Sequence, residues 1–371
     1  MSLYLSQKKD VNGKAVVLDD MILTTEFPTT AGSKMLEGYK SLFEAEVVSK
    51  LKNAGFDIAG KANVGELSLG LLGETSYFGS VTDEKGNLSL AASEILKTTD
   101  AFATIGLDAS GAIRRSAALS GQVAVKPTYG TVSRFGTISV ACSGEAVCVT
   151  ARNASDAQSI LSAIIGHDDK DGTSLSEEQC QKLNANAEFE SIKKVAIAKS
   201  LAESADEATR AKIDAVVSAF KAKGIEVEAI DDSILLAAKT AWNVLMSAEL
   251  CNNVSRYDGI KYGYRSQNYT TIGELYTNSR TEAFGELLKT AILYGSETLS
   301  DENYMKMYDK SMRVRRVLSE YFGELFGEYD ALILPEGIRV TCCRCGASKL
   351  IPTDSLIHAN EFLNADSLEL E

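Results

Sequence analysis

Residues 106–114 read GLDASGAIR, and residues 121–130 read GQVAVKPTYG. The first segment is built from small residues between Gly106 and Arg114, and Ser110 carries its only hydroxyl. Position 112 is an alanine, whose methyl group can neither attack a carbonyl carbon nor relay a proton. These two segments guide the prediction of the fold and of the site.

Helix and strand patterns alternate around these segments. Residues 44–53 have apolar side chains at helical spacing, Gly55 follows them as a helix stop, and residues 56–59 have the pattern of a strand. The same order recurs at residues 206–223, Gly224 and 225–230. Strands are also predicted at 16–18, 195–198 and 331–334, a long helix at 305–326, and a polar, flexible connector at 168–183. The sequence therefore predicts an α/β fold.

Composition narrows the class of protein. The chain has 371 residues, of which 45% are hydrophobic, and a net charge of −13. That content suffices for a large core, and the negative charge argues against direct binding to nucleic acid. We see no apolar run of membrane-spanning length and no signal peptide, so we expect no membrane association and a cytoplasmic location.

The cysteines give one weak indication of a metal site. Seven cysteines do not make a disulfide framework in a chain of this length. Cys342 and Cys345 have CxxC spacing, but a second pair is missing and His358 could add only one ligand. We therefore expect no metal and no other cofactor.

The chain resembles the amidase signature family, and within it the A subunits of glutamyl-tRNA(Gln) or aspartyl-tRNA(Asn) amidotransferases. Besides the opening segments, the motifs that carry the resemblance are 28–36 (PTTAGSKML), 60–63 (GKAN) with Glu66, 74–79 (ETSYFG), 126–136 (KPTYGTVSRFG), 166–174 (GHDDKDGTS), 256–263 (RYDGIKYG) and 279–285 (SRTEAFG). They run from about residue 13 to residue 335 and imply an amidase-signature fold, a mixed central β-sheet covered by helices on both faces. We predict one amidase-like domain over 1–371, with a helical subregion at about 234–327 and a divergent tail at 336–371.

The family's chemistry needs a serine nucleophile, a second serine on a cis peptide that relays the proton, and a neutral lysine as base. Backbone N–H groups of the glycine-rich turn stabilise the oxyanion. The resemblance places the nucleophile on Ala112, the relay serine on Ala92 and the lysine on Asp19. All three groups are replaced, and an aspartate is a weak base at neutral pH.

The resemblance also implies changes around the catalytic groups. The family's serine pair falls on Leu71 and Leu72, and the loop of the relay serine, residues 86–93, keeps one glycine. The substrate-binding tyrosine falls on Asn243, and an arginine pair on Thr290 and Ala291. Without arginine, the α-carboxylate of glutamine loses its bidentate partner. The remaining candidates for the cleft are Asp20, Asp108, Ala109, Ser110, Gly111 and Arg114.

Other residues could restore catalysis. Ser110 and Ser93 lie near the lost serines and are more simply turn residues, and Cys142 is more simply a buried apolar residue than a thiol nucleophile. Asp19 and Asp20 could act as acid and base or bind a cation, although a structural role for Asp20 is the simpler interpretation. Arg114 could bind an anion or keep a structural contact.

The interpretation we favour is a catalytically inactive member of the family that acts as a binding or scaffolding subunit, or as a ligand sensor. The alternative is an amidohydrolase or amidotransferase subunit with altered chemistry at Asp19 and Asp20. The family's terminal regions have no counterpart here, which leaves sheet edges or apolar faces to be covered. We therefore expect a protein partner, either a second copy or another chain, including the B- and C-type subunits.

Overall fold

A computed structural model describes residues 2–11, 13–185, 192–336 and 339–343. Its larger sheet has the strand order β1-β3-β2-β6-β8-β7. These strands are β1 (Tyr4–Gln7), β2 (Lys14–Asp19), β3 (Phe56–Ala62), β6 (Ala103–Asp108), β7 (Val123–Val125) and β8 (Ala146–Ala151). The pairs β2–β3 and β2–β6 are parallel, whereas β1, β7 and β8 pair antiparallel, so the sheet is mixed as predicted.

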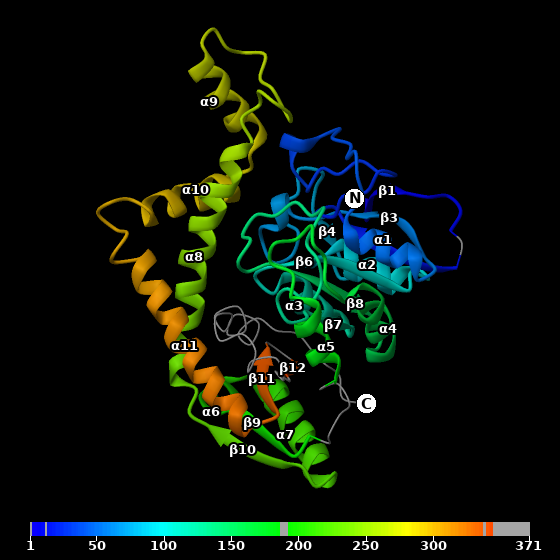
Figure 1. Ribbon diagram of the computed structural model, residues 1–371, viewed down its shortest axis with the longest axis vertical. Coiled ribbons are helices and arrows are strands. Elements are labelled where there is room, and N and C mark those ends of the chain that lie inside the picture. The colour runs from blue at the N-terminus through cyan, green and yellow to red at the C-terminus, as the bar shows by residue number, and fades with distance from the viewer. Residues whose placement is uncertain (1, 12, 186–191, 337–338, 344–371) are drawn as a thin grey trace.

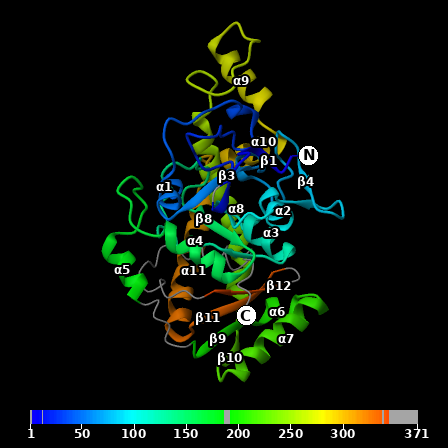
Figure 2. The ribbon, with the colours of Figure 1, turned by 90° about the vertical axis from the view of Figure 1, so that its right-hand side faces the viewer.

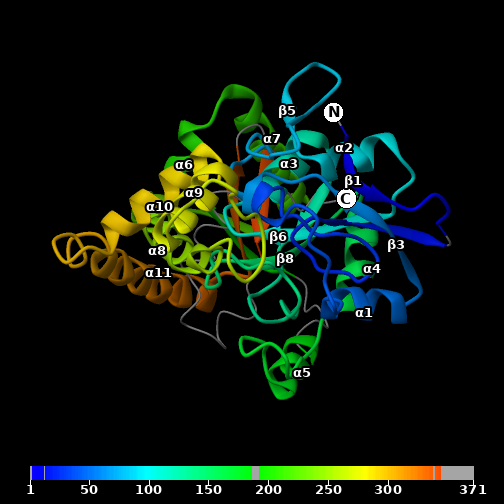
Figure 3. The same cartoon turned by 90° about the horizontal axis from the view of Figure 1, so that it is seen from above.

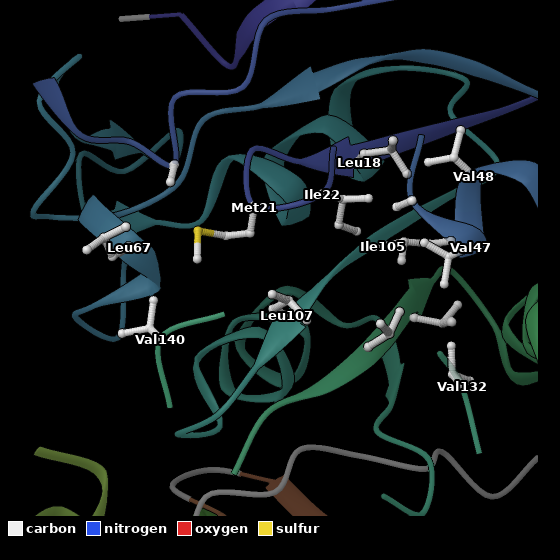
Figure 4. Close-up of a cluster of buried hydrophobic side chains, with 14 of the residues drawn as sticks. Leu18, Met21, Ile22, Val47, Val48, Leu67, Ile105, Leu107, Val132 and Val140 are labelled. Atoms are coloured by element: carbon white, nitrogen blue, oxygen red, sulfur yellow. The ribbon is translucent and has the colours of Figure 1, made fainter. Parts of the chain in front are cut away.

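Helices cover both faces of this sheet (Figure 1). On one face lie α1 (Glu46–Asn53) and α4 (Ala154–Ile164), and on the other α2 (Ala91–Thr98) and α3 (Ala112–Ser120). The strands alternate accordingly: Val16 and Leu18 belong to the core beneath α1, and Val17 to the core beneath α2. Figure 4 shows Leu18, Val47, Val48 and Ile105 in the first of these cores.

A second sheet stands apart from this central one. A separate four-stranded sheet has the order β10-β9-β11-β12, from β9 (Lys194–Ala198), β10 (Glu226–Ile230), β11 (Ala331–Glu336) and β12 (Arg339–Cys343). One face packs on α7 (Glu207–Ala222), and the other contributes to a core with α8 (Ala238–Asn253) and α11 (Tyr308–Glu328). The remaining regular elements are β4 (Val81–Thr82), β5 (Leu88–Ser89), α5 (Glu177–Ala185), α6 (Lys199–Ser204), α9 (Ile272–Ala283) and α10 (Glu286–Thr298).

Helices dominate between Ala238 and Glu328, and α8 runs beside α11 from the small sheet toward α9 (Figures 1 and 2). An 18-residue window within Ser233–Arg256, the segment that contains α8, has a mean hydropathy of 1.2, which makes the segment long and apolar enough to cross a membrane by length and composition alone. Half of it is buried inside the protein, where α8 packs against α10 and α11. Packing in the core therefore accounts for its apolar composition.

One local expectation, the flexible connector, needs correction. The polar connector at 168–183 is helical in its second part, since α5 begins at Glu177 with two acidic residues in its first turn, which suit the positive end of the helix dipole. At the start of the divergent tail at 336–371, β12 pairs antiparallel with β11. Residues 344–371 lie outside the described part of the chain.

Candidate functional site

The site begins where two parallel strands end. β2 ends at Asp19 and β6 ends at Asp108, and the register of Leu18 with Ile105 brings the carboxyl ends of both strands to one edge of the sheet. The carboxylate of Asp19 lies over the backbone of Gly106, where a Cβ atom would stand 2.3 Å from its Oδ2 atom. Only glycine at position 106 therefore leaves room for this side chain.

All three positions to which the resemblance assigns catalytic groups line one small cavity. Asp19 reaches it from β2, Ala92 from the first turn of α2 and Ala112 from the first residue of α3. The cavity has about 40 Å³ of space for water. Its wall is otherwise mainly backbone and apolar side chains, with polar groups from Asn63, Ser68 and Thr104.

A second, larger cavity of about 390 Å³ adjoins the first. The two share Ser68, Leu69 and Leu107 as lining residues. The larger one lies between the end of β6 and helices α8 and α10, which appear beside one another when the molecule is viewed from above (Figure 3). It brings together five residues named from the sequence: Ala109, Ser110, Asn243, Thr290 and Ala291. Met21, Leu67, Leu107 and Val140, which also line it, lie near one another in Figure 4.

Asp19 is a buried carboxyl with few compensating contacts. Its Oδ1 atom accepts a hydrogen bond from the N–H of Met21 at 2.9 Å, and its Oδ2 atom accepts one from the N–H of Leu107 at 2.8 Å. Burial raises the pKa of Asp19 to about 7, despite these hydrogen bonds and the positive charge of Lys61. The group can therefore gain or lose a proton near neutral pH.

Asp20 does not share this environment. Its Oδ1 atom lies 3.1 Å from the Nζ atom of Lys61, both side chains are fully buried, and its Oδ2 atom accepts a hydrogen bond from the N–H of Thr30 at 2.7 Å. Lys61 also donates to the carbonyl oxygen of Ile22. Asp20 lines neither cavity, so the two aspartates do not form a joint acid–base pair or cation site there.

Asp108, Gly111 and Arg114 form a framework beneath α3. Although burial opposes ionisation, the charges of Arg114 and Lys126 lower the pKa of Asp108 to about 2. Its Oδ1 atom lies 2.9 Å from Nη2 of Arg114 and accepts the N–H of Gly111. Gly111 has a φ of 83°, a conformation that glycine adopts without strain, and it turns the chain from β6 into α3. These groups line neither cavity.

Some sequence candidates lie elsewhere. Leu71 and Leu72 line neither cavity, and their N–H groups donate to the carboxylate of Glu74. Ser93 is buried in α2 and accepts from the hydroxyl of Ser116. The Sγ atom of Cys142 accepts from the hydroxyl of Ser139, and no histidine is recorded as its partner among the described residues.

Ser68 and Glu145 are two of the several lining residues that sequence reasoning missed. Ser68 borders both cavities and has a φ of 56°, an uncommon conformation for a residue with a Cβ atom. Glu145 borders the larger cavity, where its Oε1 atom accepts from the N–H groups of Val140 and Ala141 at 2.6 Å each. Neither residue belongs to a motif with a known chemistry, so the sequence carried no signal for them.

Metal binding finds no support in the described part of the chain, where no group of three or more His, Cys, Asp or Glu side chains is arranged to hold an ion. Cys342 lies in β12, opposite Ile333, and only the backbone is described there. Cys345 lies outside the described residues. The CxxC pair therefore stays a prediction from the sequence.

Comparison with known proteins identifies the family. The Amidase family model matches residues 5–83 and 99–341, so the chain belongs to the amidase family, and the match continues a few residues beyond the expected limit at 335. It omits residues 84–98, which contain Ala92. The assignment of position 92 therefore rests on its place in the cavity beside Asp19 and Ala112.

Two relatives carry the same name. The A subunit of glutamyl-tRNA(Gln) amidotransferase from Latilactobacillus sakei is 35% identical over 331 residues, which are 87% of this chain and 68% of the relative. Its counterpart from Lachnoclostridium phytofermentans is 34% identical over 87% of this chain and 67% of the relative. The resemblance to amidotransferase A subunits is thus confirmed, and the chain spans about two thirds of the length of these relatives.

Solved structures agree on the fold. The A subunit of glutamyl-tRNA(Gln) amidotransferase from Thermotoga maritima superposes with a TM-score of 0.71 at 24% identity, over 98% of this chain and 77% of that one. Allophanate hydrolase of Kluyveromyces lactis gives a TM-score of 0.73 at 21% identity, over 95% and 54%. The predicted α/β, amidase-signature fold is confirmed.

Proposed function

We propose that this chain is an amidase-family protein that binds a small molecule in its cleft without hydrolysing it. The observation that carries the proposal is the convergence of Asp19, Ala92 and Ala112 on one cavity. These are the positions to which the resemblance assigns base, relay and nucleophile. If the three positions had been matched to the family by error, they would not be expected to meet in one cavity.

The three replaced groups are those that carry out the acyl-transfer reaction of the family. Acyl transfer needs a nucleophile activated by a base, and a methyl group at 92 or 112 supplies neither step. Removing such a set of cooperating groups costs on the order of 10⁴ to 10⁶ in rate. Ser68 and Ser110 line the cavities, but among the described residues no lysine or histidine lines either cavity to activate their hydroxyls.

A cavity suited to a ligand persists beside the lost groups. Its volume of about 390 Å³ is in the range of small-molecule sites, about 300–1,000 Å³. Apolar side chains such as Leu250 and Leu287 make much of its wall, while Asn243, Ser247 and Thr290 add polar groups. This combination supports binding and orienting a ligand.

We further propose a cytoplasmic location, no direct contact with nucleic acid or membrane, and a role within a multisubunit complex. The relatives are named as A subunits of an amidotransferase, which supports a protein partner for this chain, including B- and C-type subunits or a second copy. The helical region exposes Leu293 on α10, Met305 before α11 and Val317 on α11 to 71%, 60% and 48%. Light scattering of the purified chain, alone and mixed with B- and C-type subunits, tests this; a monomer under both conditions would argue against such a role.

A second candidate function has one observation in its favour. A pKa of about 7 suits a general base, and Asp19 faces the small cavity, so Asp19 could serve a new reaction by itself. The separation of Asp20 from the cavity removes the partner that an acid–base pair would need.

The test is turnover of glutamine, asparagine and simple aliphatic amides, with an active family member as positive control. We expect no hydrolysis above the protein-free rate, and none from Ala112→Ser, because one hydroxyl still lacks its relay and base. Turnover that copurifies with the chain and disappears in Asp19→Asn or Ser110→Ala would overturn the proposal in favour of altered chemistry.

A further inference from the structure

The charged side chains that line the two cavities are all acidic among the described residues. Asp19 lines the small cavity and Glu145 the large one. Among the described residues that line either cavity, none is lysine, arginine or histidine. A ligand that enters therefore meets carboxylates and no side-chain cation.

The positively charged side chains near the site form ion pairs and hydrogen bonds with other groups. Lys61 pairs with Asp20 and donates to the carbonyl oxygen of Ile22 at 2.6 Å. Arg114 pairs with Asp108, and Lys126 donates to the carbonyl oxygen of Gly144 at 3.1 Å. These side chains are buried and point at groups outside the two cavities, so an anionic ligand would find no counter-charge.

Asp19 keeps capacity to accept hydrogen bonds. Each of its oxygens receives one backbone N–H, from Met21 and Leu107, while an ionised carboxylate has about four acceptor sites. It faces about 40 Å³ of space, enough for a water-sized group, and a single water needs about 10–15 Å³. Glu145, by contrast, already accepts from Val140, Ala141 and Ser139.

The larger cavity suits the apolar part of such a ligand. It holds about 390 Å³ between Leu107, Met246, Leu250 and Leu287, and it meets the small cavity at Ser68. A molecule with a hydrocarbon body in the larger cavity can therefore extend a small head group toward Asp19.

We propose that the site takes an organic amine, with its apolar body in the larger cavity and its ammonium group hydrogen-bonded to the carboxylate of Asp19. This inference rests on the ligand-binding function proposed above and names the class of ligand. Charge-assisted hydrogen bonds are stronger than neutral ones, and they supply the selectivity that an apolar wall lacks. The carboxylate of an anionic ligand meets repulsion at the same place.

Three probes of equal length test the proposal by isothermal titration calorimetry at pH 8: hexylammonium, 1-hexanol and hexanoate. We expect hexylammonium to bind about 10- to 100-fold more tightly than 1-hexanol, the range for a hydrogen bond to a charged group, and hexanoate to bind more weakly than both. In Asp19→Asn the advantage of the amine over the alcohol should fall to within about threefold. The matched control, Asp214→Asn on the exposed surface of α7, removes the same charge far from the site and should keep the order of the probes.

Failure of the inference and failure of the proposed function give different results. Equal affinities for the three probes, a preference for hexanoate, or no binding of hexylammonium would overturn the inference while leaving the absence of hydrolysis in place. Amide turnover would overturn the proposed function without changing the order of the probes. Because the order is first measured on the unaltered chain, the test remains decisive if Asp19→Asn does not fold.

Discussion

Replacement of Asp19 by asparagine should change stability in a manner that depends on pH. Burial raises the pKa of this carboxyl from 3.8 to about 7, so the folded protein holds the proton more tightly than the unfolded chain. The wild-type protein must therefore lose stability as the pH rises from about 4 to about 7, and this penalty stays constant above that range. An asparagine does not ionise and escapes the penalty.

The magnitude follows from the two pKa values. Linkage gives a penalty of about 2 kcal/mol at pH 5 and about 4 kcal/mol at pH 8. The free energy of unfolding of Asp19→Asn, minus that of the wild type, should therefore increase by about 2–3 kcal/mol between these pH values. In Asp19→Asn, the side-chain NH2 group of asparagine points at the backbone N–H of Met21 or Leu107, so that one hydrogen bond is lost. This loss costs about 1–3 kcal/mol at every pH, and it therefore shifts the difference in unfolding free energy without changing its dependence on pH.

Urea unfolding at pH 5, 6, 7 and 8, at constant ionic strength, measures this difference. Asp214→Asn is the control, and its difference from the wild type should change little with pH because that side chain is exposed on α7. A difference for Asp19→Asn that stays level, or that decreases as the pH rises, would refute the reasoning, because it would mean that Asp19 ionises as easily in the folded chain as in the unfolded one.

Two further predictions concern the frame around the site. Arg114→Met should lower the free energy of unfolding by about 3–5 kcal/mol, because the buried carboxylate of Asp108 loses its stronger ion-pair partner. The control is Arg115→Met, one residue along and exposed, which should change the free energy of unfolding by less than about 0.5 kcal/mol. Equal effects of the two substitutions in urea unfolding would contradict the role of the ion pair. Gly295→Ala on α10 should destabilise the protein by about 1–3 kcal/mol, because the new Cβ atom would stand 2.0 Å from a carbonyl oxygen of α8. Gly323→Ala on α11 meets open space and should stabilise the protein by about 0.5–1 kcal/mol. A melting temperature that rises in both variants would show that α8 and α10 can separate freely.

The sequence predicted the local elements well where they depend on periodicity. The helix and strand expected around Gly55 are α1 and β3, and those around Gly224 are α7 and β10. Division into two sheets could not be predicted, because it depends on which distant strands pair. The convergence of Asp19 on Gly106 likewise follows from the parallel pairing of β2 with β6, which no local pattern encodes.

Prediction of the lining residues was less complete for a physical reason. Leu71 and Leu72 follow a turn in which the carboxylate of Glu74 accepts their N–H groups, and this turn keeps both side chains out of the cavities. The same segment presents Ser68 instead, in a left-handed conformation. A side chain's direction in an irregular loop depends on such hydrogen bonds, and a sequence resemblance places only its position along the chain.

The proposed loss of the catalytic groups is compatible with a retained frame because different residues serve the two roles. Glu66 accepts from the hydroxyl of Ser33 at 2.7 Å and from the N–H of Gly285 at 2.8 Å, and thereby joins the sheet region to the start of α10. Neither Ser33 nor Glu66 lines a cavity, and α10 contributes Thr290 to the larger one. Positions 19, 92 and 112 take no part in this connection, so under the proposed function the cleft keeps its shape while a single carboxylate stands where the resemblance implies a nucleophile and its base.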